Sequence, residues 1–275
     1  MQFDQHRIAI RERSFLDLLD LGLRVSREYA APLAAWLAVG VLPAAAFNAW
    51  LLGDVAAQID TGQVVGYLFM MTLLVVYEAP LALAPATLFL GQALSMERPR
   101  WQGILRQWLG SLPQIVLYQG LLRFLFLFRP YVSEIILLER NPIRRRGTFG
   151  KSTYARCRAL HAGEGGELFG RWFISLSLAT LLVIAIWGSL LTTRAMLLRS
   201  AEGGLGDVLS ALFQDESEID LSIVAVWYPL VLWTVVGYFA VVRFLAYVDL
   251  RIRREGWEVE LVMRAERERL MRRTA

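Results

Sequence analysis

The last hydrophobic stretch of the chain, residues 221–242, places the strongest constraint on its fold. It contains no charged residue and exceeds the roughly 20 apolar residues that one helix needs to cross a bilayer. Pro229 lies inside it and is expected to bend it. Beyond Val242 there is neither glycine nor proline until Gly256, so we predict one helix from Leu221 through at least Arg254. This helix would leave the membrane as a charged stalk, which predicts an integral membrane protein.

Three other segments are also apolar enough to span a membrane: 30–53, 64–96 and 172–193. The second is long and carries Glu78, Pro80 and Pro85, which predicts a tilted, bent helix. Neighbouring helices would satisfy the backbone groups that the prolines leave without a partner. With 56% hydrophobic residues and such long uncharged runs, the chain does not have the composition of a soluble domain.

Residues 112–139 are apolar but are interrupted by Arg123, Arg129, Pro130 and Glu134. The basic segments on both sides, 98–106 and 140–146, are both expected in the cytoplasm. The chain must then enter and leave on one face. We predict a re-entrant or short helical hairpin that turns near Arg129 and Pro130, shielded by protein or water. The alternative, a hairpin that crosses the membrane twice, is disfavoured by its length and charges.

Short amphipathic segments precede several of these apolar runs. Residues 14–27 place Phe15, Leu18 and Val25 on one face of a helix. This helix would either lie in the membrane interface or pack against the cytoplasmic side of the protein, and the sequence favours neither alternative. Residues 97–111 form a second such segment, with Trp101 and Trp108 expected as interfacial anchors. Residues 153–161 form a third.

Arginine distribution predicts the topology. Segments before residue 30, between 97 and 171, and after 242 are rich in arginine, whereas 53–63 and 194–220 are acidic. The positive-inside rule therefore predicts cytoplasmic N- and C-termini. The N-terminus has no apolar core, so we expect no cleavable signal peptide. Lys151 is the only lysine, a bias typical of GC-rich bacterial genomes.

The predicted fold class is all-α: an integral membrane helical bundle of four full transmembrane helices, the hairpin and interfacial amphipathic helices. We expect one domain over residues 1–275. It would comprise a cytoplasmic N-terminal segment (1–29), the membrane bundle (30–250) and a charged helical tail (251–275).

Four ionisable residues within apolar segments form the first candidate site: Glu78, Arg123, Arg129 and Glu134. Charges at membrane depth are costly, usually face the protein interior and pair. If the hairpin packs beside the second span, Glu78 would meet Arg123 or Arg129. Such a cluster would line a polar cavity or substrate path, or form a structural ion pair.

A second candidate site is basic. It comprises Arg144, Arg145, Arg146, Lys151, Arg251, Arg253 and Arg254. Clusters beside membrane spans attract anionic lipid headgroups, and they also suit contact with another membrane or cytoplasmic protein. Because topology and lipid contact already account for the charge, no nucleic-acid partner is predicted.

The sequence shows no established pattern of catalysis or cofactor binding. Residues 147–153 resemble a phosphate-binding loop, but Arg145 stands where that pattern needs glycine. His161, Glu164 and Glu167 are separated by glycines and are interpreted as a polar turn. Two histidines and the single Cys157 leave few nucleophile–base combinations. We therefore expect no metal, no cofactor and no catalytic residue.

One family resemblance is present. After the last span come Tyr247, Asp249, Arg251, Arg253 and Glu255, and an apolar run containing GQAL ends at Arg98 and Pro99. In these features the chain resembles uncharacterised bacterial multispan proteins that are similar to the membrane domain of glycerophosphoryl diester phosphodiesterases. The resemblance implies a helical membrane module that often serves as a partner to other domains. It implies no catalytic residue here.

These observations favour a non-enzymatic protein of the bacterial inner membrane, a scaffold or accessory subunit of a membrane complex. One alternative is a small transporter or lipid-handling protein with a polar cavity near Glu78. Another is a membrane-embedded hydrolase, since membrane enzymes can use carboxylates alone.

Overall fold

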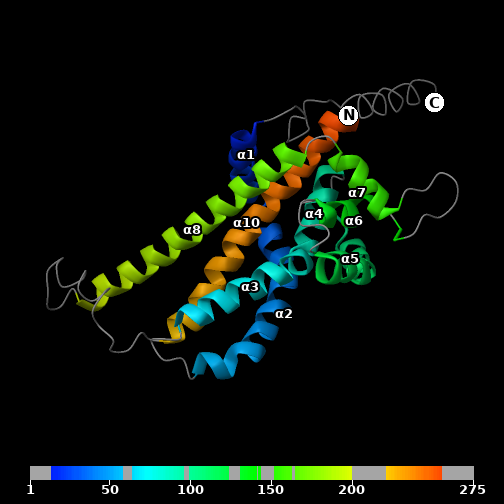
Figure 1. Ribbon diagram of the computed structural model, residues 1–275. Helices are drawn as coiled ribbons and strands as arrows, with labels where there is room; N and C mark the ends of the chain where they lie inside the picture. The colour runs from blue at the N-terminus through cyan, green and yellow to red at the C-terminus, as the bar shows by residue number, and fades with distance from the viewer. Residues whose placement is uncertain are drawn as a thin grey trace, which may run out of the picture.

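The computed structural model describes residues 14–57, 64–95, 99–123, 131–140, 142–143, 152–162, 165–199 and 221–255. No strand occurs within these ranges. The elements are α1 (Phe15–Glu28), α2 (Ala30–Ala57), α3 (Val64–Ala82), α4 (Ala84–Ser95), α5 (Trp101–Ile115), the π-helical η3 (Val116–Leu121), α6 (Val132–Glu139), α7 (Thr153–His161), α8 (Gly165–Arg199) and α10 (Leu221–Glu255) (Figure 1).

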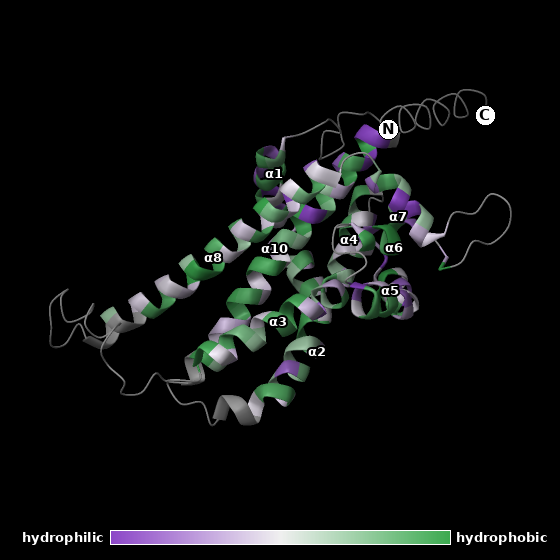
Figure 2. Ribbon diagram, in the orientation of Figure 1, coloured by the Kyte–Doolittle hydropathy of each residue, from purple (hydrophilic) through white to green (hydrophobic). Residues whose placement is uncertain are grey.

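Four stretches are long and apolar enough to cross a membrane: Ala30–Gly53, Val64–Leu94, Gly165–Thr193 and Val224–Arg254. They belong to α2, to α3 with α4, to α8 and to α10. The predicted all-helical fold with four long apolar helices is therefore confirmed. Hydrophilic residues gather at the end of the molecule where α7 and the end of α10 lie (Figure 2).

Helix α10 is the centre of the bundle. It packs against α1, α2, α3, α4 and α8. About two thirds of the residues in its most apolar 18-residue stretch are buried. Tyr228 and Leu232 belong to one hydrophobic core, and Phe244 and Leu250 belong to the other. As predicted, the helix continues without interruption past Arg254.

Residues 64–95 form the predicted bent helix. Helix α3 ends at Ala82 and α4 begins at Ala84, with only Leu83 between them. The amide of Leu83 still donates to Ala79 O at 2.9 Å, so the chain bends without a loop. At this bend α2 approaches very closely, because a Cβ atom at Gly40 would lie 1.8 Å from the carbonyl oxygen of Ala82. Only glycine at position 40 permits this approach.

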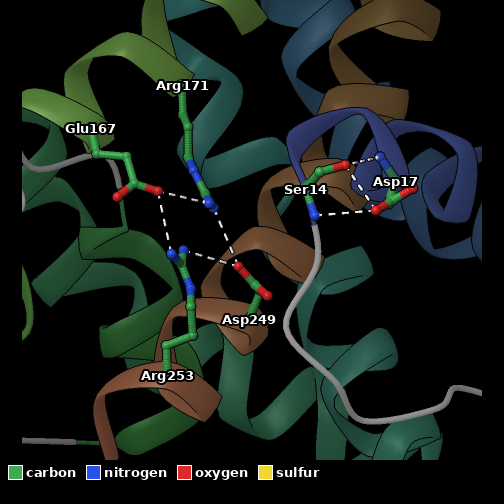
Figure 3. Close-up of polar contacts among 6 residues, drawn as sticks. All are labelled: Ser14, Asp17, Glu167, Arg171, Asp249 and Arg253. Carbon is green, nitrogen blue, oxygen red and sulfur yellow. Dashed lines mark hydrogen bonds and ion pairs between the residues drawn. The ribbon is translucent and has the colours of Figure 1, made fainter.

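Helix α1 begins with a capping box and packs on α10. The Asp17 amide donates to Ser14 Oγ at 3.2 Å, and the Ser14 amide donates back to the Asp17 carboxylate (Figure 3). Gly22 is buried against Val242, and Tyr238 donates to the Leu19 carbonyl at 3.0 Å. The sequence left open whether this helix lies in the membrane interface or packs against the protein. Its buried face packs against the protein.

The opposite face of α1 exposes Leu16 and Leu23. The same face carries Asp20 and Arg24, which form an exposed ion pair at 2.8 Å, so it is largely charged. The apolar side of the helix, with Leu18 and Val25, is the side that is buried.

Helices α5 and η3 pack against α6, the arrangement expected of the two arms of the predicted hairpin. Gln107 on α5 donates through its side chain to the carbonyl of Leu137 on α6, which holds the arms together. Residues 132–137 are all buried, so the second arm is shielded as predicted. The expected turn at Arg129 and Pro130 lies outside the described residues.

Three boundaries differ from the prediction. The first hairpin arm is continuous with the amphipathic segment, because α5 begins at Trp101 rather than at residue 112. Trp101 is exposed as expected of an anchor, but Trp108 is partly buried and donates to the Leu81 carbonyl at 3.3 Å. Helix α8 extends at both ends beyond the predicted 172–193. Helix α7 matches its prediction.

Candidate functional site

The last turns of α10 organise the charged residues at one end of the bundle. Tyr247 and Arg251 are four residues apart and lie on one side of the helix. Asp249 and Arg253 are also four residues apart, and each follows a member of the first pair by two residues. Two residues turn an α-helix by roughly half a turn, so this second pair lies on the opposite side. The helix therefore presents two separate pairs of polar groups to two different sets of neighbours.

On the first side, Glu139 at the end of α6 receives three donors. Arg156 of α7 donates to its carboxylate from Nε at 2.5 Å and from a terminal nitrogen at 2.8 Å. The Tyr247 hydroxyl donates to it at 2.8 Å, and Arg251 lies 3.8 Å away. Burial raises the pKa of the Glu139 carboxyl, but these donors and charges outweigh burial and hold the pKa below its ordinary value.

On the second side, four residues of α8 and α10 form a closed ring of ion pairs (Figure 3). Arg171 contacts Glu167 at 2.9 Å and Asp249 at 3.3 Å. Arg253 contacts the same two carboxylates, at 3.3 Å and 3.0 Å. Asp249 and Arg253 are four residues apart on α10, so helix geometry alone brings them together. The ring fastens the start of α8 to the end of α10.

Apart from these two groups, a further ion pair joins α10 to α6. Arg243 of α10 donates from Nε to Glu134 of α6 at 2.5 Å. The Glu134 side chain is 0% exposed, and that of Arg243 is 31% exposed. Burying a carboxylate so completely requires a charged partner. Glu134 was a predicted member of the polar cluster, but its partner comes from the last span, which the sequence did not indicate.

Arg123 reaches α3 but does not contact the carboxylate of Glu78. Its guanidinium donates to the carbonyls of Val76 and Tyr77, at 3.0 Å and 3.4 Å, and lies 5.9 Å from the centre of the Tyr77 ring. Among the described residues no ion pair joins Arg123 to Glu78. Arg129, the other expected partner, lies outside them.

The two prolines of the second span explain why these contacts form. Proline lacks an amide hydrogen, so Pro80 and Pro85 leave the carbonyls four residues earlier without their helical donors. Those carbonyls belong to Val76 and Leu81. Arg123 donates to the first and Trp108 to the second. The hairpin thus supplies the hydrogen bonds that the prolines removed, as the sequence predicted of a neighbouring helix.

Glu78 lies beside a residue that sequence reasoning missed, Asn48 of α2. Both lie in stretches that are long and apolar enough to cross a membrane. Glu78 Oε2 and both polar side-chain atoms of Asn48 are buried without a hydrogen-bond partner in the described structure. The detectable signal was Asn48 itself, a polar side chain within an uncharged span.

The predicted basic site is divided by the structure. Arg251 and Arg253 take part in the internal ion pairs described above, whereas Arg254 is exposed and donates to the Ala162 carbonyl. Its other members lie outside the described residues: Arg144, Arg145, Arg146 and Lys151.

Arg171 and Arg243 were not predicted as site residues, although each pairs with a carboxylate. The available signal was the presence of Glu134 and Glu139 at the two ends of a short apolar run. Carboxylates in such a run need cations from elsewhere in the chain.

The histidine, cysteine and carboxylate side chains of the described residues do not gather into a metal-binding group. In the described ranges, no three His, Cys, Asp or Glu side chains are grouped so as to hold a metal ion. His161 is buried, and its Nδ1 lies 2.7 Å from the carbonyl of Cys157 on its own helix. The charged groups neutralise one another, which suits the joining of helices.

The fold and these ion pairs define an all-helical protein whose four long apolar helices indicate a membrane protein. Comparison with known proteins gives no match to a family model, a curated sequence or a solved structure.

Proposed function

We propose that the protein is a non-enzymatic scaffold or accessory subunit of a complex in the bacterial inner membrane, with both termini in the cytoplasm. The observation that carries this proposal is the position of α8. In the most apolar 18-residue stretch of α8 no residue is buried. In the corresponding stretch of α10, 67% of the residues are buried. A full-length span attached along only one side leaves a long apolar surface for a second membrane protein.

The chemistry of α8 suits such a lateral contact. Its exposed hydroxyls at Thr180, Ser189 and Thr193 each donate to the carbonyl four residues earlier. These polar groups are therefore satisfied within the helix and do not oppose contact with apolar surfaces. Meanwhile the ring of ion pairs around Arg171 and Asp249 holds the start of the helix in place. The resemblance to membrane modules that serve as partners of other domains points the same way.

Site-specific photocrosslinking tests this function. A photoreactive residue at Ile184 of α8, which is 61% exposed, is expected to crosslink in native membranes to one defined membrane protein. The same group at Val226 of α10, which is 63% exposed, is the matched control and should give no such product. The partner should also copurify stoichiometrically with the full chain in mild detergent. Deletion of residues 257–275 should abolish copurification while leaving membrane insertion intact.

Crosslinks from Ile184 to lipid alone would mean that α8 faces only the bilayer, which would contradict the scaffold. Retention of every partner by the truncated chain would leave the scaffold in place but limit residues 257–275 to the role of a topology anchor.

Asn48 and Glu78 support a second candidate, a small transporter. Polar atoms buried within spans and lacking partners are suited to bind a cation or a small polar molecule. Native mass spectrometry of the purified protein distinguishes the two. A bound small molecule that is lost in Glu78→Gln favours transport, and a stoichiometric protein partner favours the scaffold.

A further inference from the structure

A cavity of about 530 Å³ lies between α5 and α6, outside the ion pairs of α10. Its α5 wall is formed by Gly103, Arg106, Gln107, Gly110, Ser111 and Gln114. These positions recur every three to four residues along α5, so they share one face of the helix. Arg140, the residue that ends α6, forms part of the opposite wall. The volume falls within the range of about 300–1,000 Å³ typical of small-molecule sites.

The charge of this cavity is positive and is not balanced by its lining. Arg106 and Arg140 line it, and no carboxylate does. The nearest acid in sequence, Glu139, is bound by Arg156 and Tyr247 on the side of α10. Arg106 is exposed and forms no hydrogen bond or ion pair with any described residue. The two guanidinium groups therefore lack an internal counter-ion in the described structure.

Arg140 is held in position by its neighbour. It donates to the side-chain oxygen of Gln107, whose amide nitrogen in turn donates to the Leu137 carbonyl. This chain of hydrogen bonds keeps the guanidinium at the cavity wall. Gly110 leaves space beside it, since a Cβ atom there would meet nothing within 4 Å. Arg140 is thus held in position in advance of binding, and the cavity is open enough to admit a ligand.

The backbone at Arg140 provides an independent observation. Its φ is 53°, in the left-handed region, and among the described residues no other non-glycine residue has a positive φ. Glycine or asparagine usually ends a helix in this conformation, because a larger side chain is strained there. An arginine that occupies such a position at a cavity wall is a candidate for function.

We propose that this cavity binds a phosphate group, carried either by an anionic phospholipid or by a small soluble phosphate ester. Arginine pairs with phosphate through parallel, charge-assisted hydrogen bonds, and two arginines at one cavity match a phosphate better than a single charge does. Trp101, 62% exposed at the start of α5, is a residue type common at the level of lipid headgroups. This proposal does not depend on the scaffold function.

Binding by the detergent-purified full chain tests the site. Native mass spectrometry would follow retention of phosphatidylglycerol, with phosphatidylcholine as the reference lipid. Isothermal titration calorimetry with glycerol phosphate would test the soluble source. Arg106→Gln should weaken the ligand by roughly tenfold, as expected for loss of one charge-assisted pair. The double variant Arg106→Gln, Arg140→Gln should bind more weakly still.

The control is Arg158→Gln, which removes an exposed arginine from neighbouring α7. Arg106 has no described partner inside the protein, so its replacement should leave circular dichroism and gel-filtration behaviour unchanged. Phosphatidylglycerol binding that depends on Arg106 but not on Arg158 supports a lipid source. Glycerol phosphate binding with the same dependence supports a soluble one. Equal loss in the Arg106 and Arg158 variants, or no binding of either probe, overturns the site.

Discussion

At the scale of single residues, Arg243 shows how a charge is accommodated within one of the four long apolar helices. Its partner Glu134 has no exposed surface, so the two charges must neutralise each other. Removing both can cost little, whereas removing one leaves an isolated buried charge. The free energy of unfolding should therefore fall more when one partner is removed than when both are removed.

We therefore predict that Arg243→Met alone lowers the free energy of unfolding by about 3–5 kcal/mol. The double variant Glu134→Leu, Arg243→Met should be close to wild type, because apolar side chains of similar volume fill the same space. Unfolding by sodium dodecyl sulfate in mixed micelles measures both. Equal losses in the single and double variants would show that the two side chains are not coupled.

At the scale of elements, the bend between α3 and α4 depends on the hairpin. Each proline of the bent span frees one carbonyl, and α5 with its continuation returns one donor to each. An unsatisfied backbone group in an apolar environment costs about 1–3 kcal/mol. The bent span and the hairpin are thus a single structural unit, although they are consecutive elements that could have folded separately.

A double-mutant cycle tests this dependence. Arg123→Met keeps the apolar stem of the side chain but removes its donors, and should lower the free energy of unfolding by about 1–3 kcal/mol. In the Pro80→Ala background the loss should be smaller, because the amide of residue 80 can then donate to the Val76 carbonyl. Arg158→Met, an exposed position on α7, is the control and should show no coupling to Pro80→Ala. Strictly additive losses of unfolding free energy in the Arg123 and Pro80 variants would show that Arg123 does not compensate for the proline.

At the scale of the whole molecule, one end of the bundle is polar and joined by ion pairs, while the long helices away from it are apolar (Figure 2). Helices α1 and α7 and the end of α10 lie towards the polar end (Figure 1). This asymmetry agrees with the arginine distribution from which we propose that the polar end faces the cytoplasm.

Cysteine labelling in intact cells tests the proposed sidedness. With Cys157 replaced by alanine, cysteines introduced at Asp60 and Asp215 are expected to react with a membrane-impermeant maleimide. Cysteines at Arg145 and Glu260 are expected to react only after the membrane is permeabilised. Labelling of position 145 from outside would mean that the hairpin crosses the membrane and does not return to the same face.

The sequence by itself determined the elements. Long apolar runs specified the four spans, and two prolines specified the bend. The absence of glycine and proline between Val242 and Gly256 specified the continuation of α10. These signals are local, because hydrophobicity and proline act on the backbone where they occur. The pair Asp249–Arg253 was predictable for the same reason, since helix geometry alone brings residues four apart together.

Only the tertiary structure decided which charges meet across the bundle. Glu134 and Arg243 are 109 positions apart in the chain, and Glu139 and Tyr247 are 108 apart. Their pairing depends on which helices are neighbours and on how each is rotated about its axis. No local pattern encodes those two properties, because they follow from the packing of all the helices together.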